Sequence, residues 1–262
     1  MSRWSGQVVL VTGSARGIGF AIAEAFAQGG AHIVLSDVQE DLLSAARQKL
    51  SRYPGRVFTQ VCDVSDASAC EALIDAAQAE FGRLDVLVNN AGISIVAEFE
   101  TCRPEAMKKL VEVNLLGSMY MSQAALPLIR AQRGSLVFVS SVSGIRAIPK
   151  GAIYSSSKAA LRSFAESLRV ELGPAGVHVG VVSPGFTTSD GAKTVMNGDG
   201  SPRPIERPAH DTPAGVAAQV VQLVRHRQRE RVLTPLGKAT AVLQRLSPWL
   251  LDKVLAGREL KN

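Results

Sequence analysis

The stretch Val8-Val9-Leu10-Val11-Thr12-Gly13-Ser14-Ala15-Arg16-Gly17-Ile18-Gly19 decides the fold. Its apolar, mostly β-branched start predicts a buried strand, Val8–Val11, and helical spacing of apolar residues begins at Ile18 and continues to Gln28. Glycines at such a strand-to-helix junction let the backbone approach a pyrophosphate, and the N–H groups of the new helix then point at the anion. The spacing is TGxxxGxG, not GxGxxG. It predicts a dinucleotide site formed by Gly13, Ser14, Arg16, Gly17, Ile18 and Gly19.

Asp37 follows the second predicted strand, His32–Ser36. A carboxylate there accepts hydrogen bonds from an adenosine ribose and repels a 2′-phosphate, which favours NAD over NADP. Arg16 favours the opposite choice, because a guanidinium near the ribose suits a phosphate. We give Asp37 more weight, since repelling a buried phosphate costs more than leaving an arginine in water.

The rest of the chain alternates short apolar strands with longer helices. This pattern predicts an α/β fold with a parallel sheet covered by helices on both faces. No break in composition divides the chain, so we expect one domain over residues 1–262. The further predicted strands are Arg56–Val61, Leu84–Val88, Ser135–Ser140, Val177–Val182 and Val232–Thr234, and the helices are Glu40–Leu50, Ala67–Phe81, Pro104–Ile129, Ile153–Leu172 and Thr212–Arg225.

Composition restricts the class of partner. Of the 262 residues 46% are hydrophobic and 20% charged, with a net charge of +6 spread along the chain. The densest basic run, Arg225 to Arg231, has no aromatic residues within it, so we expect a solvated helix end and turn and no nucleic-acid site. The cysteines Cys62, Cys70 and Cys102 have no metal-ligand spacing, which predicts no metal and a reducing, cytoplasmic location. We find no signal region and no stretch long enough to span a bilayer.

Two segments leave the strand–helix alternation. Residues 186–211 are rich in Gly, Pro, Asp and Thr and predict a substrate lid loop. Residues 237–262 form an amphipathic tail, which Ser247-Pro248 divides into two short helices. We expect the tail to pack on its own domain or on a sister subunit, with weak peripheral membrane contact as the alternative. The apolar positions that recur at helical spacing are Leu243, Leu246, Leu250 and Val254.

Tyr154 and Lys158 are four residues apart, so they lie on one face of a helix. A free phenol has a pKa of about 10 and is a poor base at neutral pH. A neighbouring ammonium favours the phenolate and lowers that pKa. The pair therefore suits proton exchange with an alcohol or a carbonyl, although two residues at this spacing also fit an ordinary surface pair.

With these residues in place, the chain resembles the short-chain dehydrogenase/reductase family over nearly its whole length. The resemblance implies a doubly wound, Rossmann-type three-layer sandwich with a seven-stranded parallel sheet, and a homodimer or homotetramer. The motifs that carry it follow in order: Thr12 to Gly19, Asp63-Val64, Asn89-Asn90-Ala91-Gly92, Asn114, Ser141, and Tyr154 to Lys158.

The resemblance implies four catalytic residues. Tyr154 would be the acid/base, and Ser141 would hydrogen-bond the substrate oxygen. Lys158 would bind the nicotinamide ribose and lower the pKa of the phenol. Asn114 would hold a water that links Lys158 to solvent.

It also implies further cofactor contacts. Asp63 and Val64 would flank the adenine, and Asn90, with Ala91 and Gly92 after it, would lie near the adenosine ribose. Pro184-Gly185 would turn under the nicotinamide, with the backbone of Thr187 near the carboxamide. The family often has a threonine five residues after that proline, where this chain has Ser189, preceded by Thr187 and Thr188.

These roles predict reversible hydride transfer between a nicotinamide cofactor and a secondary alcohol or ketone. A non-catalytic, dinucleotide-binding redox sensor is the alternative, and a nucleotide-sugar epimerase or dehydratase is a third hypothesis. We expect an apolar small-molecule substrate, with steroid, retinoid, acyl and small cyclic compounds all open. The candidate pocket residues are Ile95, Val96, Ile145, Ile148, Phe186, Val195 and Met196, with Arg146 and Lys193 as the candidate charges.

Overall fold

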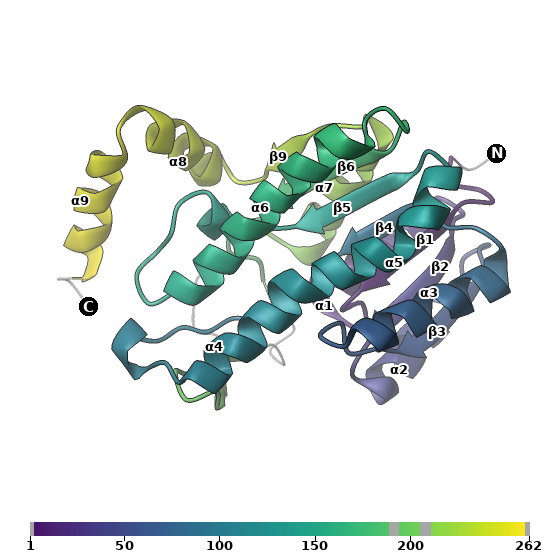
Figure 1. Cartoon of the computed structure of the whole chain (residues 1–262), viewed down its shortest axis with the longest axis horizontal. Coiled ribbons are helices and arrows are strands. Elements are labelled where there is room, and N and C mark those ends of the chain that lie inside the picture. Colours follow the sequence, from purple (N-terminus) through teal and green to yellow (C-terminus); the bar gives the residue numbers. More distant parts are fainter. Residues whose placement is uncertain (1–2, 189–193, 205–210, 260–262) are drawn as a thin grey trace.

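The computed structural model describes residues 3–188, 194–204 and 211–259. Seven parallel strands form one sheet in the order β3-β2-β1-β4-β5-β6-β9, with helices on both faces (Figure 1). The predicted α/β, doubly wound fold is therefore confirmed. The strands are β1 Val8–Thr12, β2 His32–Asp37, β3 Val57–Val61, β4 Val86–Asn89, β5 Ser135–Val139, β6 His178–Ser183 and β9 Glu230–Val232.

The helices divide between the two faces because successive strand residues point to opposite sides of the sheet. Val9 and Val11 pack against α1, α2 and α7, whereas Val8 and Leu10 pack against α3, α5 and α6. Each of these four strand residues is at most 1% exposed, as a sheet covered on both sides requires. The helices are α1 Gly17–Gln28, α2 Glu40–Leu50, α3 Ala67–Phe81, α5 Gly117–Ala131, α6 Ala152–Leu172 and α7 Pro213–Arg225.

The strand order reverses between β1 and β4. β1 pairs with β2 on one side and with β4 on the other, so the connections on its two sides run in opposite directions. Such a reversal opens a crevice at the carboxyl ends of the strands, where α/β proteins bind their ligands. The segments after β1, β4, β5 and β6 all reach this edge.

The predicted helix Pro104–Ile129 is interrupted. It consists of α4 Pro104–Val111, a π-helical turn η2 at Glu112–Leu116, and α5. The π turn contains Asn114, which is fully buried. Helical periodicity in the sequence continues across the interruption, so the sequence carried no sign of it.

Two short strands are missing from the sequence prediction, and a third is displaced. Within the segment 186–211, predicted as a substrate lid loop, β7 Thr194–Met196 and β8 Pro202–Pro204 form an antiparallel hairpin. The last sheet strand is Glu230–Val232, two residues before the predicted Val232–Thr234. Strands of three residues are too short to establish an alternating pattern, and the prolines of β8 argue against a strand.

The carboxyl-terminal tail forms two helices, α8 Pro235–Leu246 and α9 Pro248–Glu259, divided at the predicted Ser247-Pro248. They lie at one end of the molecule, beyond the β9 edge of the sheet (Figure 1). Arg146 contacts both, through Gln244 of α8 at 3.2 Å and through an ion pair with Asp252 of α9. Within the described ranges, no helix has the length and apolarity to cross a membrane.

Candidate active site

The glycine loop after β1 is built for close approach. Gly13 and Gly17 have positive φ angles of 62° and 58°, a region that glycine adopts without strain. A Cβ at Gly13 would lie 2.8 Å from the Cα of Ala91, and one at Gly19 would lie 2.1 Å from the carbonyl oxygen of Gly13. The backbone therefore forms a cradle that side chains would fill, which fits a pyrophosphate.

The motif after β4 holds this loop in place. Asn90 donates its side-chain amide to the carbonyl oxygens of Thr12 and Gly13 at 2.9 and 3.0 Å. In return, the Thr12 hydroxyl accepts hydrogen bonds from the backbone N–H groups of Asn90 and Ala91, both at 3.0 Å. Asn90 thus has a structural task at the predicted cofactor site.

The first turn of α1 faces the same edge of the sheet. Its N-cap residue, Arg16, makes no side-chain capping hydrogen bond to the helix, and its first turn contains no acidic residue. The N–H groups of a first turn have no partner within their helix and carry partial positive charge. This end of α1 is therefore suited to a phosphate.

Asp37 ends β2 beside the glycine loop. One carboxylate oxygen accepts from the N–H of Ala15 at 3.2 Å and the other from the N–H of Gln39 at 3.2 Å. These bonds fix a half-buried carboxylate close to Ser14 and Arg16 in the chain. The predicted adenine residues differ from each other: Asp63 is exposed and bonded to Ser65, whereas Val64 is buried.

Tyr154 lies in the first turn of α6 and faces two hydroxyl groups. Burial raises the pKa of the phenol above its usual value, while hydrogen bonding with the side chains of Ser141 and Ser94 lowers it in part. The net direction is upward, opposite to the lowering that we expected from Lys158. Solvent exclusion, which disfavours the charged phenolate, is the dominant effect. Sequence analysis missed Ser94 because its segment shows no regular pattern.

Lys158 lies one turn further along α6 and is 4% exposed. Its ammonium donates to the carbonyl oxygen of Val139 at 2.9 Å, at the end of β5. The same nitrogen is 5.9 Å from the centroid of the Tyr154 ring. The predicted common face of the two side chains is therefore present.

The side chain of Asn114, in the π turn, lies close to the ammonium of Lys158. Its side-chain oxygen accepts from the N–H of Ile93 at 2.8 Å, and its amide donates to the carbonyl of Ile93 at 2.9 Å and to Ser157 at 3.1 Å. A Cβ added to Gly92 would lie 3.2 Å from Asn114 and 3.4 Å from the Lys158 nitrogen. Gly92, Asn114 and Lys158 therefore converge.

Ser141 lies two residues after the end of β5 and caps the short 3-10 helix η3, Val142–Gly144, by accepting from the N–H of Ser143 at 3.1 Å. The N–H of Val142 donates to the carbonyl of Pro184 at 2.9 Å, which ties this segment to the predicted nicotinamide turn. Gly185 lies against Thr234, and the backbone of Thr187 forms a bridge with Asp211. The remaining predicted contact, Ser189, lies outside the described residues.

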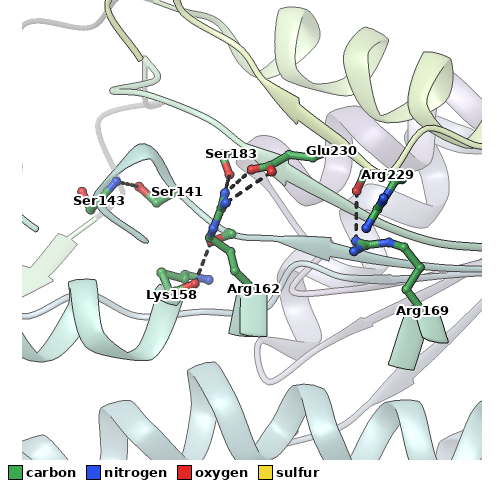
Figure 2. A network of polar contacts seen from close by, with 9 residues as sticks. Ser141, Ser143, Lys158, Arg162, Arg169, Ser183, Arg229 and Glu230 are labelled. Carbon is green, nitrogen blue, oxygen red and sulfur yellow. Dashed lines mark hydrogen bonds and ion pairs between the residues drawn. The ribbon is translucent and has the colours of Figure 1, made fainter. Parts of the chain in front are cut away.

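Arg162 of α6 reaches Ser183 and Glu230 (Figure 2). One turn after Lys158, its guanidinium contacts Ser183 at 3.4 Å and forms an ion pair with Glu230 of β9. It thereby connects α6 to the end of β6, immediately before the Pro184-Gly185 turn. The same side chain lines a pocket of about 280 Å³ with Glu166, Arg169, Val181, Arg229, Glu230 and Arg245.

The cluster of side chains beside Tyr154 is apolar. Ile95 packs with Ala106 and Leu110, and with Tyr154 and Met196 at the margin of the cluster. The guanidinium of the candidate charge Arg146 contacts the tail helices, through Gln244 and Asp252. The other candidate charge, Lys193, lies outside the described residues.

The structure thus brings a glycine loop, at the reversal in strand order, to the same edge of the sheet as Tyr154 and Lys158. The sequence model for short chain dehydrogenases matches residues 7–199. The chain belongs to this family, which confirms the resemblance drawn from its motifs.

Relatives and solved structures agree with that assignment. An uncharacterised oxidoreductase of Methylorubrum extorquens is 37% identical over 195 residues, 74% of this chain and 78% of the relative. The 11-beta-hydroxysteroid dehydrogenase 1A of Arabidopsis thaliana is 38% identical over 71% of this chain, which spans about half (53%) of that relative.

Among solved structures, a short chain dehydrogenase/reductase of Burkholderia phymatum in complex with NAD superposes with a TM-score of 0.82 at 25% identity, covering 96% of this chain and 97% of that one. An alcohol dehydrogenase of Thermococcus sibiricus, complexed with 5-hydroxy-NADP, gives a TM-score of 0.77 at 28% identity, covering 87% and 95%.

Proposed function

We propose that this oxidoreductase exchanges a hydride between NAD(H) and an apolar secondary alcohol or ketone, with Tyr154 as the acid/base. The observation that carries the proposal is the phenol of Tyr154 beside the hydroxyl of Ser141, on the helix face that also holds Lys158. In the oxidising direction Tyr154 takes the hydroxyl proton while the carbinol hydride passes to the bound nicotinamide, which supplies the redox chemistry.

The other three residues assist this step. Ser141 and Tyr154 stabilise the negative charge that develops on the substrate oxygen. Lys158 binds the nicotinamide ribose and, once it does so, favours the phenolate by its charge. Asn114, fixed to Ile93 by two hydrogen bonds of 2.8 and 2.9 Å, holds a water that links Lys158 to solvent.

The cofactor is NAD, with NADP the less favoured choice. Asp37 supports this because a half-buried carboxylate beside the glycine loop accepts from the ribose hydroxyls and repels a 2′-phosphate. The two solved relatives divide between NAD and an NADP derivative, so the fold alone does not select one.

The substrate is apolar and steroid-like. The cluster of Ile95, Ala106 and Leu110 beside Tyr154 offers an apolar wall, and Met196, from the described part of the predicted lid, packs against it. The similarity to the 11-beta-hydroxysteroid dehydrogenase 1A of Arabidopsis thaliana supports a steroid as the first substrate class to test.

The first prediction tests the mechanism. Tyr154→Phe removes the only atom that exchanges the proton, so we expect kcat to fall roughly a hundredfold or more while cofactor binding stays intact. The measurement is NADH absorbance with a panel of hydroxysteroids and cyclic secondary alcohols, and cofactor binding is followed by thermal shift. A Phe variant that turns over at the wild-type rate would rule out this mechanism.

The second prediction tests cofactor choice. We expect NAD to stabilise the wild-type protein more than NADP does in a thermal-shift assay. Asp37→Ser should weaken NAD and improve NADP, since it removes the ribose acceptor and the repulsion together. Asp75→Asn, an exposed acid on α3, is the control with the same change of charge and should alter neither. Stronger stabilisation of the wild type by NADP would contradict our weighting of Asp37.

The redox-sensor alternative makes a different prediction. A sensor binds the dinucleotide but shows no change in NADH absorbance with any member of the panel. An epimerase or dehydratase would convert a nucleotide sugar without net change in NADH, and the apolar wall beside Tyr154 does not favour such a polar substrate.

We also propose a cytoplasmic homodimer or homotetramer. Three buried free cysteines suit a reducing compartment. The tail presents Leu246, Trp249 and Val254, which are 78%, 59% and 46% exposed, and a sister subunit would cover them. Sedimentation of the full chain against one ending before Ser247 tests this, and flotation with anionic vesicles tests the alternative of weak membrane contact.

A further inference from the structure

Ser94 stands between two parts of the site that no motif connects. It follows Ile93, whose backbone N–H and carbonyl are both held by Asn114. Its side chain is, with that of Ser141, a hydrogen-bond partner of the Tyr154 phenol, and Tyr154 packs in the apolar cluster of Ile95, the next residue in the chain. The backbone before Ser94 is therefore fixed, and its side chain reaches the acid/base.

The backbone after Ser94 is paired with the β7–β8 hairpin. The carbonyl of Ser94 accepts from the N–H of Met196 at 2.7 Å, and the N–H of Val96 donates to the carbonyl of Met196 at 3.0 Å. Ile95 and Met196 thereby form a parallel bridge. The segment 94–96 is in effect a third strand of the small hairpin sheet.

Further contacts fasten the same hairpin to the body. The N–H of Arg103 donates to the carbonyl of Gly198 at 2.8 Å, and the guanidinium of Arg203 donates to the carbonyl of Val96 at 3.2 Å. Pairing of a backbone segment on this scale restricts its dihedral angles, and these decide where the Cβ of Ser94 points.

We propose that Ser94 is a positioning residue through which the paired β7–β8 hairpin holds the Tyr154 phenol in place beside Ser141. The proposal rests on the acid/base role given to Tyr154 above. When the hairpin is paired, the Ser94 hydroxyl donates to the phenol oxygen. When the pairing is broken, the Ser94 backbone is released and the phenol loses this donor. Pairing of the hairpin therefore affects the phenol oxygen through the Ser94 side chain.

The direction of the effect follows from the charge on the phenol. A hydrogen bond donated to the phenolate stabilises the charged form and lowers the pKa of Tyr154. Removing the donor therefore raises that pKa. At neutral pH less phenolate is then present, and alcohol oxidation slows.

The test uses four single variants of the full chain and one double variant. Ser94→Ala removes the hydroxyl and Ser94→Thr keeps it. Met196→Pro removes the N–H that donates to Ser94 while leaving the Ser94 side chain unchanged. Ser163→Ala, an exposed serine of α6, is the matched control, and Ser94→Ala with Met196→Pro forms the double variant.

Two readouts separate this proposal from the proposed function. The first is the titration of Tyr154 itself, measured as the tyrosinate absorbance that Tyr154→Phe lacks, since the chain has only 3 tyrosines. The second is the pH profile of kcat with the best alcohol of the panel. Circular dichroism defines the pH range over which each variant stays folded.

We expect Ser94→Ala to raise the titration midpoint and to lower kcat at neutral pH by about tenfold. Met196→Pro should move both in the same direction, and the double variant should go no further than Ser94→Ala, because both changes break one chain of contacts. Ser94→Thr and Ser163→Ala should match the wild type.

A Tyr154 titration in Ser94→Ala that coincides with the wild type overturns the proposal. So does a Met196→Pro titration that stays at the wild-type midpoint while Ser94→Ala shifts, because the hairpin is then not coupled to the phenol. Undiminished turnover by Tyr154→Phe would instead refute the proposed function, and the titration shift would still report on the contact.

Discussion

The shape of the predicted nucleotide site depends on single glycine residues. At Gly19 a Cβ would lie 2.1 Å from the Gly13 carbonyl oxygen and 2.5 Å from the Asn90 amide, so the loop has no room for any side chain there. Gly82 is glycine for a different reason: its φ is 72°, yet a Cβ would meet nothing within 4 Å. The first glycine is required by packing and the second by backbone conformation alone.

This contrast gives a residue-scale prediction. Gly19→Ala should lower cofactor affinity more than tenfold and destabilise the fold by about 2 kcal/mol, because the backbone of the loop must move. Gly82→Ala should cost about 1 kcal/mol through strain and leave cofactor affinity unchanged. Urea unfolding and cofactor titration measure the two effects. Equal cofactor affinities in both variants would contradict the role given to the glycine loop.

At this scale the motif residues were predictable and their partners were not. Gly13, Tyr154 and Lys158 can be identified in the sequence from their residue type and their spacing. Ser94 and the turn of Arg146 toward the tail depend on which segments meet in space, and no local pattern records that. The pKa of Tyr154 could not be predicted either. Burial raises it, and the spacing of residues in the sequence does not show how deeply a side chain is buried.

At the scale of elements, the π turn η2 is the feature that the site depends on most. An extra residue in a helical turn redirects the side chains that follow it. Here the turn carries Asn114, whose side chain makes hydrogen bonds to both backbone groups of Ile93 and to Ser157. The helix is thereby joined to the segment that leads to Ser94.

Asn114→Ala should therefore affect both stability and turnover. It leaves the backbone groups of Ile93 without their partner, at a cost on the order of 2–3 kcal/mol. We expect kcat to fall as well, with KM for the cofactor changed less. Ser118→Ala, in the next turn of α5, is a matched control for local helix damage. If that control lost as much turnover, the effect would belong to the helix and not to Asn114.

Elements of ordinary length were predictable because each repeats its period several times. The sheet strands up to β6 and the helices α1, α2, α3, α6 and α7 lie within a few residues of their predicted bounds. The hairpin β7–β8 was not predicted because three residues complete little more than one period. β7 pairs with β8 and with residues 94–96, and these contacts are distant in sequence.

At the scale of the whole molecule, His178 makes the stability of the folded sheet depend on pH. Its ring is buried and bridges Ser135 of β5 at 3.1 Å and the carbonyl of Gln228 at 2.9 Å, so one side chain joins three segments at the amino end of the sheet. Burial lowers the pKa of His178 below its ordinary value of 6.5. The folded protein therefore holds this ring neutral where the unfolded chain would protonate it.

The sign of the resulting pH dependence follows directly. The contribution of His178 is complete above pH 6.5 and is lost as the pH falls through the lower, folded pKa. We expect the free energy of unfolding to decline below neutrality, with at most about 1.4 kcal/mol per pH unit from this one group. His178→Phe should flatten the decline in urea unfolding series. An equally steep decline in the variant would assign the pH dependence to other groups.

Topology also orders events during folding. The glycine loop and the motif that holds it are 77 residues apart in sequence, as in the bond from Asn90 to Gly13. A nascent chain that ends before β4 contains the glycine loop but lacks Asn90 and Ala91, which hold the loop in place. Closing so long a loop is slow, because its entropy is lost before its contacts form. The cradle for the nucleotide therefore forms only in a chain that already includes β4 and the Asn90 motif.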